Sequence, residues 1–202
     1  MITVTNVDKT FSDNKVLKNV SAVFEAGKIN MIIGASGSGK TVLMKSIIGL
    51  HRIDKGQIEY DGRNLPDMHM REIRRLRREV GMLFQGSALF DSMSVLENVL
   101  YPLEMFSQTS KEEMKERAIT CLCRVNLPEN SYALSPSEIS GGMQKRVAIA
   151  RAIALQPKYL FCDEPNSGLD PKTSLIIDRL ISEITHEFDI TTIINSHDMN
   201  SV

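Results

Sequence analysis

The feature that most constrains the fold is a glycine-rich loop, Gly34–Thr41, which joins an apolar segment to a helical one. Residues 28–33 are mostly apolar, which predicts a buried strand. Leu43, Ile47 and Ile48 follow at helical spacing. Two further apolar runs, 159–162 and 190–194, predict more strands of the same kind. Continuous apolar strands combined with a strand–loop–helix unit favour an α/β fold with a parallel sheet.

The loop matches the pattern G-x-x-x-x-G-K-[ST], which chance produces in roughly one chain of this length in a hundred. Glycines let successive backbone N–H groups point at phosphate oxygens, and the helix start adds its positive dipole end. We expect Lys40 to reach the β- and γ-phosphates of a nucleotide and the Thr41 hydroxyl to ligate Mg²⁺. The expected binding residues are Gly34, Ala35, Ser36, Gly37, Ser38, Gly39, Lys40 and Thr41. A glycine turn that binds nothing is the alternative, and the flanking strand and helix disfavour it.

Acidic residues and a histidine follow the two other apolar strands. Asp163 ends one strand and predicts a second Mg²⁺ anchor, while the adjacent Glu164 can accept a proton from an attacking water. In isolation, such a pair is more often a solvated strand end. His197 follows the last strand, where its side chain can point into a ligand crevice and donate to a γ-phosphate. A lone surface histidine is the default interpretation of such a residue.

Composition excludes several classes of protein. The 202 residues suffice for one large domain or two small ones, and the formal charge of −1 argues against a nucleic-acid partner. No apolar run is long enough to cross a bilayer, and charges among the first twenty residues disfavour a secretory signal. Three cysteines fit reduced thiols in the cytosol better than disulfides.

The middle of the chain is predicted to be helical. Ser94 and Ser110 each begin a capping-box pattern, and Pro102 is expected to kink or end the first of these helices. Ser140 is expected to begin another helix. Nearer the N-terminus, residues 2–7, 20–24 and 57–60 predict strands.

Together these segments resemble the ATP-binding subunits of ABC transporters, from Ile2 to the end of the chain. The motifs that carry the resemblance are a Walker A loop at 34–41, a Q-loop at 81–85, a signature at 139–143, a Walker B strand at 159–163 and a D-loop at 167–170. The resemblance implies that Gln85 joins Thr41 and Asp163 at Mg²⁺ and takes part in catalysis. It also implies that Glu164 is the catalytic base, His197 the switch histidine, and Phe11 the aromatic that stacks on adenine.

The resemblance implies an α/β fold of the P-loop NTPase (RecA-like) type, with an N-terminal antiparallel β subdomain and an inserted helical subdomain. We expect one ATP-binding domain over residues 1–202. Residues 1–85 would form the β subdomain and the first part of the core, 86–155 the helical subdomain, and 156–202 the rest of the core. Five residues follow His197, fewer than this family normally has, so we expect the core to be incomplete at its C-terminus.

The signature residues Ser140, Gly141 and Gly142 lie at a predicted helix start, which favours an anion. A simple helix cap is the alternative. The resemblance implies a head-to-tail pair of copies, in which each signature closes over the ATP of the other copy. ATP hydrolysis to ADP and phosphate would then open the interface. Membrane permease subunits are the other implied partners, which would place the chain in the cytoplasm, peripheral to the inner face of the membrane.

One signature residue departs from the family pattern. Met143 stands where the family has glutamine, and Gln144 follows one position later on another side of the helix. Met143 cannot make a polar contact to ribose or phosphate, so we expect hydrolysis to depend more on backbone donors.

Residues 81–92 and Met143 resemble the bacterial phospholipid-trafficking (Mla/Mce-type) ATPases, which implies a lipid cargo. An importer ATPase for amino acids or another small solute is the alternative. A soluble ABC ATPase acting on DNA or ribosomes, and a small P-loop kinase, are more distant ones. The short segment between Gln85 and the signature excludes the long coiled coil of the chromosome-maintenance type.

Two surface features remain open. Four of five clustered arginines, all but Arg77, share a helical face. They are expected to form a solvated face, partly paired with Glu72 and Glu79, with anionic lipid head groups as the alternative partner. The cluster consists of Arg71, Arg74, Arg75, Arg77 and Arg78. Apolar residues in 88–106 predict either the core of the helical region or a surface for membrane subunits.

Overall fold

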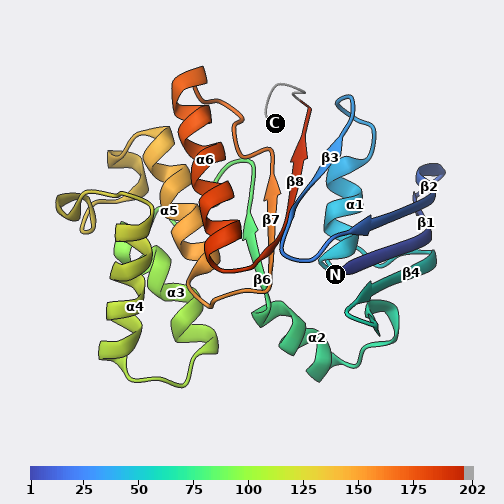
Figure 1. The fold of residues 1–202 in the computed structure, drawn as a ribbon, viewed down its shortest axis with the longest axis horizontal. Helices are drawn as coiled ribbons and strands as arrows, with labels where there is room; N and C mark the ends of the chain where they lie inside the picture. Colours follow the sequence, from blue (N-terminus) through green and yellow to red (C-terminus); the bar gives the residue numbers. More distant parts are fainter. Residues whose placement is uncertain (198–202) are drawn as a thin grey trace.

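A parallel sheet of four strands, in the order β3-β8-β7-β6, forms the centre of the molecule (Figure 1). The computed structural model describes residues 1–197. The strands of this sheet are β3 (Ile29–Ile33), β6 (Val80–Leu83), β7 (Tyr159–Asp163) and β8 (Thr191–Ser196). Every residue of β7 and β8 is buried, as expected for inner strands covered on both faces. The predicted parallel α/β core is therefore confirmed.

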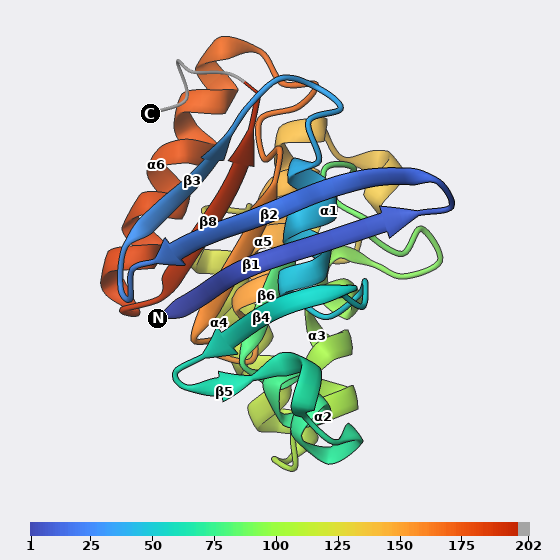
Figure 2. The ribbon, with the colours of Figure 1, turned by 90° about the vertical axis from the view of Figure 1, so that its right-hand side faces the viewer.

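A second sheet, antiparallel and ordered β2-β1-β4-β5, lies beside the first (Figure 2). Its strands are β1 (Ile2–Phe11), β2 (Asn14–Phe24), β4 (Lys55–Tyr60) and β5 (Arg63–Asn64). The hairpin between β1 and β2 turns at Ser12, which has a positive φ of 50°. This sheet matches the antiparallel part that the resemblance implies.

Helix α1 (Lys40–Ile47) fills the space between the two sheets (Figure 1). Its buried residues Leu43, Met44 and Ile47 share one apolar core with the antiparallel sheet and with Tyr159 and Phe161 of β7. The intervening residues of β7, Leu160 and Cys162, belong to a second core on the opposite face. The parallel sheet thus separates two apolar cores.

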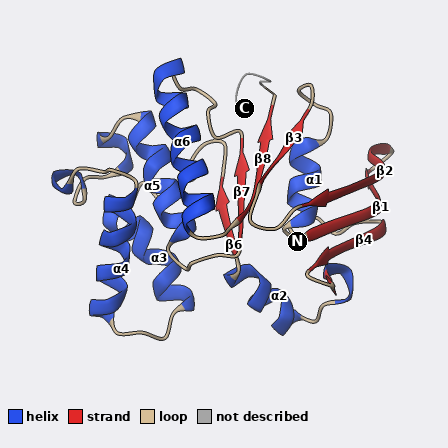
Figure 3. Cartoon of the chain, viewed as in Figure 1, coloured by secondary structure: helices blue, strands red, loops and turns tan. Residues whose placement is uncertain are grey.

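The second core is formed largely by helices on the far side of the sheet (Figure 3). These helices are α3 (Val95–Phe106), α4 (Lys111–Arg124), α5 (Gly141–Ile153) and α6 (Pro171–Glu187). Short 3₁₀ turns lie at Leu65–Asp67, Glu129–Ser131 and Pro136–Glu138. Since the helices of 95–153 share this core with β7 and α6, they do not bury a core of their own. The proposed division at 85/86 and 155/156 stays a prediction.

The predicted helix starts are confirmed at atomic detail. Ser94 accepts from the backbone N–H of Glu97, whose carboxylate accepts from Ser94 N, and Ser110 forms the same reciprocal pair with Glu113. The expectation that Pro102 ends the first helix is wrong, because α3 continues to Phe106. Three buried side chains of the helix, Val95, Val99 and Leu103, hold it in the core across the proline.

Helix α6 was missed in the sequence. Asp170 is its N-cap, Pro171 its first residue, and Ile177, Leu180, Ile181 and Ile184 form a buried face. These are ordinary start and periodicity signals. The D-loop at 167–170 therefore leads directly into a helix that covers the sheet.

The arginine cluster lies on α2 (Met70–Arg78), and its expected acidic partners are otherwise engaged. Glu72 accepts from the backbone N–H of His69, and Glu79 pairs with Arg63 at 2.7 Å. Within residues 1–197, the five cluster arginines make no ion pair with an acidic side chain. The expected pairing with Glu72 and Glu79 is thus wrong, because each carboxylate caps or pairs elsewhere.

The apolar residues of 88–106 divide between core and surface. Phe90, Met105 and Phe106 are exposed, whereas Val95, Val99 and Leu103 are buried. No helix in residues 1–197 has the length and apolar character to cross a membrane.

Candidate functional site

The loop between β3 and α1 has the backbone shape that an anion site requires. Gly37 and Gly39 have φ values of 78° and 95°, in the left-handed region that glycine adopts without strain. A Cβ on Gly39 would come within 3.2 Å of Val16 Cγ1. Gly39 is also the N-cap of α1 and supplies no side-chain acceptor, so the first N–H groups of the helix remain open to a ligand.

Lys40 and Thr41 begin α1 and carry the polar side chains of the loop. The Lys40 ammonium donates to the carbonyl oxygens of Gly34 and Ala35 at 2.8 and 3.0 Å, which holds it within the loop. Thr41 Oγ1 donates to Asp163 Oδ1 at 3.3 Å. The sequence placed these groups 122 positions apart, and the parallel register of the sheet brings them together.

Asp163 and Glu164, at the end of β7, contact different residues. Asp163 is buried and faces Thr41, whereas Glu164 Oε2 lies 2.9 Å from His197 Nδ1. Glu164 has a φ of 48°, a conformation that costs a non-glycine residue about 1–3 kcal/mol and concentrates at functional sites. The two adjacent carboxylates therefore contact different partners, Thr41 for Asp163 and His197 for Glu164.

The Q-loop residue Gln85 follows β6 and links to two other segments. Its side-chain Nε2 donates to Ser167 Oγ at 3.2 Å. Its backbone carbonyl oxygen accepts from the ammonium of Lys145 on α5. Lys145 is buried, and burial lowers its pKa. Sequence reasoning missed this lysine because its position on α5 gives no sign that it is buried.

One cavity brings together predicted residues from four separate segments. It is lined by Val16, Ser36, Gly37, Gly39, Lys40, Thr41, Val42, Gln85, Glu164 and His197. Phe11 does not line it. The Phe11 ring is 40% exposed, with the Lys9 ammonium 5.1 Å from its centroid and the His51 ring at its edge. Its role as an adenine platform stays a prediction.

The residues at this cavity fit Mg²⁺ bound with a nucleotide. Mg²⁺ takes oxygen ligands and is usually held by one or two protein groups together with phosphates and waters. Thr41 and Asp163 supply two adjacent oxygen donors beside the phosphate loop, and Gln85 lines the same cavity. Within residues 1–197, no group of three or more His, Cys, Asp or Glu side chains could hold a metal ion.

The signature residues lie away from this cavity. Ser140 is the N-cap of α5 and accepts from Met143 N at 3.3 Å, as a helix cap does. Ser140, Gly141 and Gly142 line a separate cavity together with Gly168, Asp170 and Thr173. Helices α1 and α5 lie on opposite sides of the parallel sheet (Figure 1). The structure thus brings the signature next to the D-loop and not next to the phosphate loop of the same chain.

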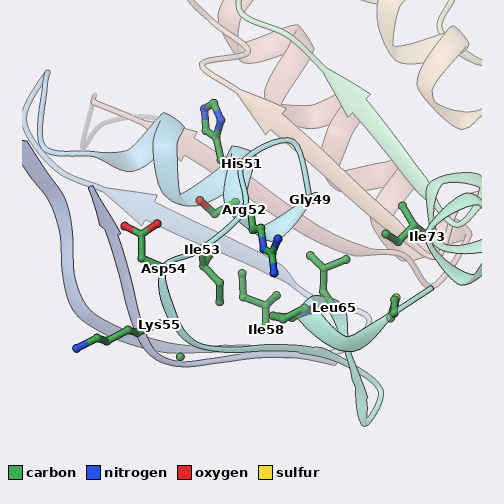
Figure 4. Close-up of a pocket in the computed structure, with 13 residues that line it drawn as sticks. Gly49, His51, Arg52, Ile53, Asp54, Lys55, Ile58, Leu65 and Ile73 are labelled. Atoms are coloured by element: carbon green, nitrogen blue, oxygen red, sulfur yellow. The ribbon is translucent and has the colours of Figure 1, made fainter. Parts of the chain in front are cut away.

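Another cavity lies at the far end of α1, against β4 (Figure 4). Ile53, Ile58, Leu65 and Ile73 form its apolar wall, and Arg52 points into it. His51 points away from it, toward Phe11. None of the predicted nucleotide residues lines this cavity.

Comparison with known proteins identifies the family of this chain. Residues 17–167 match the family described as ABC transporter. The chain is 39% identical over 202 residues to a methionine import ATP-binding protein, MetN, of Clostridium tetani, covering all of this chain and 63% of that protein. It is 36% identical over 199 residues to a probable ribonucleotide transport ATP-binding protein, mkl, of Mycobacterium bovis, covering 98% of this chain and 55% of that protein.

Solved structures give the same assignment. A dimeric structure of the bacterial ABC transporter cassette MJ0796 superposes with a TM-score of 0.90 at 35% identity, covering all of this chain and 90% of that one. The cbiO1 protein of Clostridium perfringens, part of the ABC transporter complex cbiONQ, also gives 0.90, at 30% identity, with 100% and 80% covered. The matched family, the similarity along all of this chain and the shared fold show that this chain belongs to the ABC transporter family.

Proposed function

We propose that this chain binds Mg·ATP at the loop Gly34–Thr41 and hydrolyses it to drive an ABC transporter. The observation that carries the proposal is the convergence of this loop with Glu164 and His197 on one cavity, where Asp163 is bonded to Thr41. A cassette with the same fold has been solved with ADP and phosphate after hydrolysis, at 34% identity to this chain. The chain covers less than two thirds of the two transport relatives named above, so the activity of the whole protein is part of this proposal.

Each residue of the cavity has a distinct role in the proposed reaction. The loop N–H groups and Lys40 bind the phosphates, and Thr41, Asp163 and Gln85 hold the metal. Mg²⁺, when bound, neutralises charge on the β- and γ-phosphates. Glu164 Oε2 accepts a proton from the attacking water, and His197 Nδ1, 2.9 Å away, orients that carboxylate.

Replacing Glu164 by glutamine tests the base. The amide keeps the size of the side chain but cannot take the proton, so phosphate release by the assembled transporter should fall about 10²–10⁴-fold while ATP still binds. Glu104→Gln, at an exposed position on α3, is the matched control and should leave the rate unchanged. A wild-type rate of phosphate release by the Glu164→Gln protein would show that Glu164 is not the catalytic base.

We further propose that the signature residues Ser140–Gly142 act on the ATP of a second copy, in a head-to-tail pair. Their separation from the phosphate loop of the same chain supports this pairing, because the N-terminus of α5 then adjoins a different cavity, where an anion from another copy can bind. The MJ0796 cassette, which shares the fold, is described as a dimer. A small-molecule kinase would instead stay monomeric with ATP and transfer phosphate to its substrate.

Two cargo classes remain in the proposal. Met143 and the 81–92 segment support phospholipid trafficking, and the 39% identity to a methionine importer supports amino-acid import. In either case the partners are membrane permeases, which would hold the chain at the inner face of the cytoplasmic membrane. The exposed Phe90, Met105 and Phe106 support a protein partner at that surface.

Purification of the chain from membranes with its bound subunits decides between the two cargoes. A permease together with a lipid-binding subunit would support lipid transport. A permease together with an amino-acid-binding protein would support import and contradict the lipid assignment.

A further inference from the structure

Asn195 is a buried amide in β8 that touches both protein groups expected at the metal. Its Nδ2 donates to Asp163 Oδ1 at 2.6 Å and lies 3.3 Å from Thr41 Oγ1. The same Asp163 oxygen accepts from Thr41 Oγ1 at 3.3 Å. The three side chains therefore form a closed triangle of hydrogen bonds, in which the short bond is the one that Asn195 makes.

Asn195 makes the shorter of the two side-chain hydrogen bonds to Asp163. The carboxylate is 6% exposed, and within residues 1–197 it forms no ion pair with a basic side chain. Burying a polar group costs free energy unless hydrogen-bond partners replace the lost water. Among the described residues, Thr41 and Asn195 supply these side-chain donors, and the Asn195 bond is shorter by 0.7 Å.

Asn195 is not explained by stability alone. It is fully buried between the two apolar cores of the sheet, and its Oδ1 is buried without a partner in the described structure. An unsatisfied buried acceptor destabilises the fold, and an apolar residue at this position would avoid that cost. Such an exception to buried polar satisfaction is expected where a residue serves a site.

We propose that Asn195 is a positioning residue of the metal site, which fixes the Asp163 carboxylate and the Thr41 hydroxyl for Mg²⁺ bound with ATP. The inference rests on the proposed function and adds to it a residue that none of the motifs contains. It assigns Asn195 to the outer shell of the metal, and it predicts an effect on metal affinity and not on the metal-free binding of nucleotide.

The test compares Asn195→Leu and Asn195→Ala with wild type by titrating a fluorescent ATP analogue, first in EDTA and then against Mg²⁺. Loss of an outer-shell hydrogen bond typically weakens metal affinity about 10–100-fold, so the Mg²⁺ concentration at half-saturation should rise by that factor in both variants. Affinity for the analogue in EDTA should not change. Mn²⁺ binding, followed by electron paramagnetic resonance, gives a readout independent of nucleotide fluorescence.

Thr192→Val is the matched control. Thr192 lies on the same strand, is fully buried, and bonds to Thr185 Oγ1 at 2.6 Å, away from Asp163. It controls for the loss of a buried hydrogen bond in β8, and it should leave the Mg²⁺ dependence unchanged. Asn195→Ala adds no volume to the core, so it remains informative if the leucine variant does not fold.

Two outcomes contradict different statements. If the Asn195 variants show the same Mg²⁺ dependence as Thr192→Val, the positioning role is wrong while the ATP site stands. If wild-type protein shows no Mg²⁺-dependent binding of the analogue, the proposed function itself is wrong.

Discussion

At the scale of single residues, Lys145 shows how one buried charge connects separate parts of the site. Its ammonium reaches from α5 to the backbone of the Q-loop, and lies near the carboxylates of Asp163 and Glu164. Burial lowers its pKa below the ordinary value of 10.5, because a charge in the interior loses its hydration. The same lysine therefore has a predictable effect on stability as the pH changes.

The prediction compares wild type with Lys145→Met. Between the lowered folded pKa and the unfolded pKa of 10.5, the unfolded chain holds a proton that the folded chain has released. Stability therefore rises with pH in that window. The free energy of unfolding of wild type, minus that of Lys145→Met, should be larger at about pH 10 than at about pH 8, measured by urea denaturation.

Lys158→Met is the control for this comparison, because the Lys158 side chain is 65% exposed. Its difference from wild type should not grow over the same pH range. An equal difference at both pH values for Lys145→Met would show that the lysine titrates alike in the folded and unfolded chains.

At the scale of elements, the close approach of α5 to α6 depends on one glycine. A Cβ on Gly142 would lie 2.7 Å from Cγ2 of Thr173, in the first turn of α6. Thr173 cannot move freely, since its hydroxyl and its backbone N–H both bond to the N-cap Asp170. The first turns of α5 and α6, which line the signature cavity, can therefore approach this closely only because residue 142 has no side chain.

Gly142→Ala should therefore overpack this contact and destabilise the fold by about 1–3 kcal/mol. Thr173→Ser removes the obstructing methyl and keeps the hydroxyl, so the double variant Gly142→Ala/Thr173→Ser should recover most of the loss. Gly86→Ala is the control, because a Cβ there would meet nothing within 4 Å. Thermal unfolding is measured for wild type, the two single variants, the double variant and Gly86→Ala, and purely additive effects would argue against the contact.

At the scale of the whole molecule, the phosphate loop and the signature lie at separate places. The phosphate loop and the signature line separate cavities, with the parallel sheet between α1 and α5. In a head-to-tail pair each site would take its loop from one copy and its signature from the other. Such a pair makes complementation between two defective chains possible.

The complementation test uses Lys40→Ala, which lacks the phosphate contact, and Gly141→Asp, which places a negative charge at the signature. Both are made in the Glu164→Gln background so that bound ATP persists. Each variant alone should stay monomeric with Mg·ATP, and their mixture should form dimers on size exclusion, because one complete site is restored. If either variant alone forms dimers, or if the mixture forms no dimers, the proposal that each ATP site is shared between two copies is wrong.

The sequence alone determined the features that short-range patterns encode. These features depend on neighbours a few residues away in the chain. They are the phosphate loop, the acidic end of β7, the capping boxes at Ser94 and Ser110, and the apolar strands. Helix α6 belongs to the same class, since Asp170-Pro171 and its apolar spacing could have identified it.

The tertiary structure decided which distant groups meet. Glu79 pairs with Arg63 and not with the arginine cluster, Lys145 lies beneath the Q-loop, and Asn195 bonds to Asp163 across the sheet. No local pattern marks these contacts, because each depends on the strand order β3-β8-β7-β6 and on how the helices pack against it. The sequence determines which polar side chains are present. Which of them become hydrogen-bond partners in the interior is decided only when the core packs.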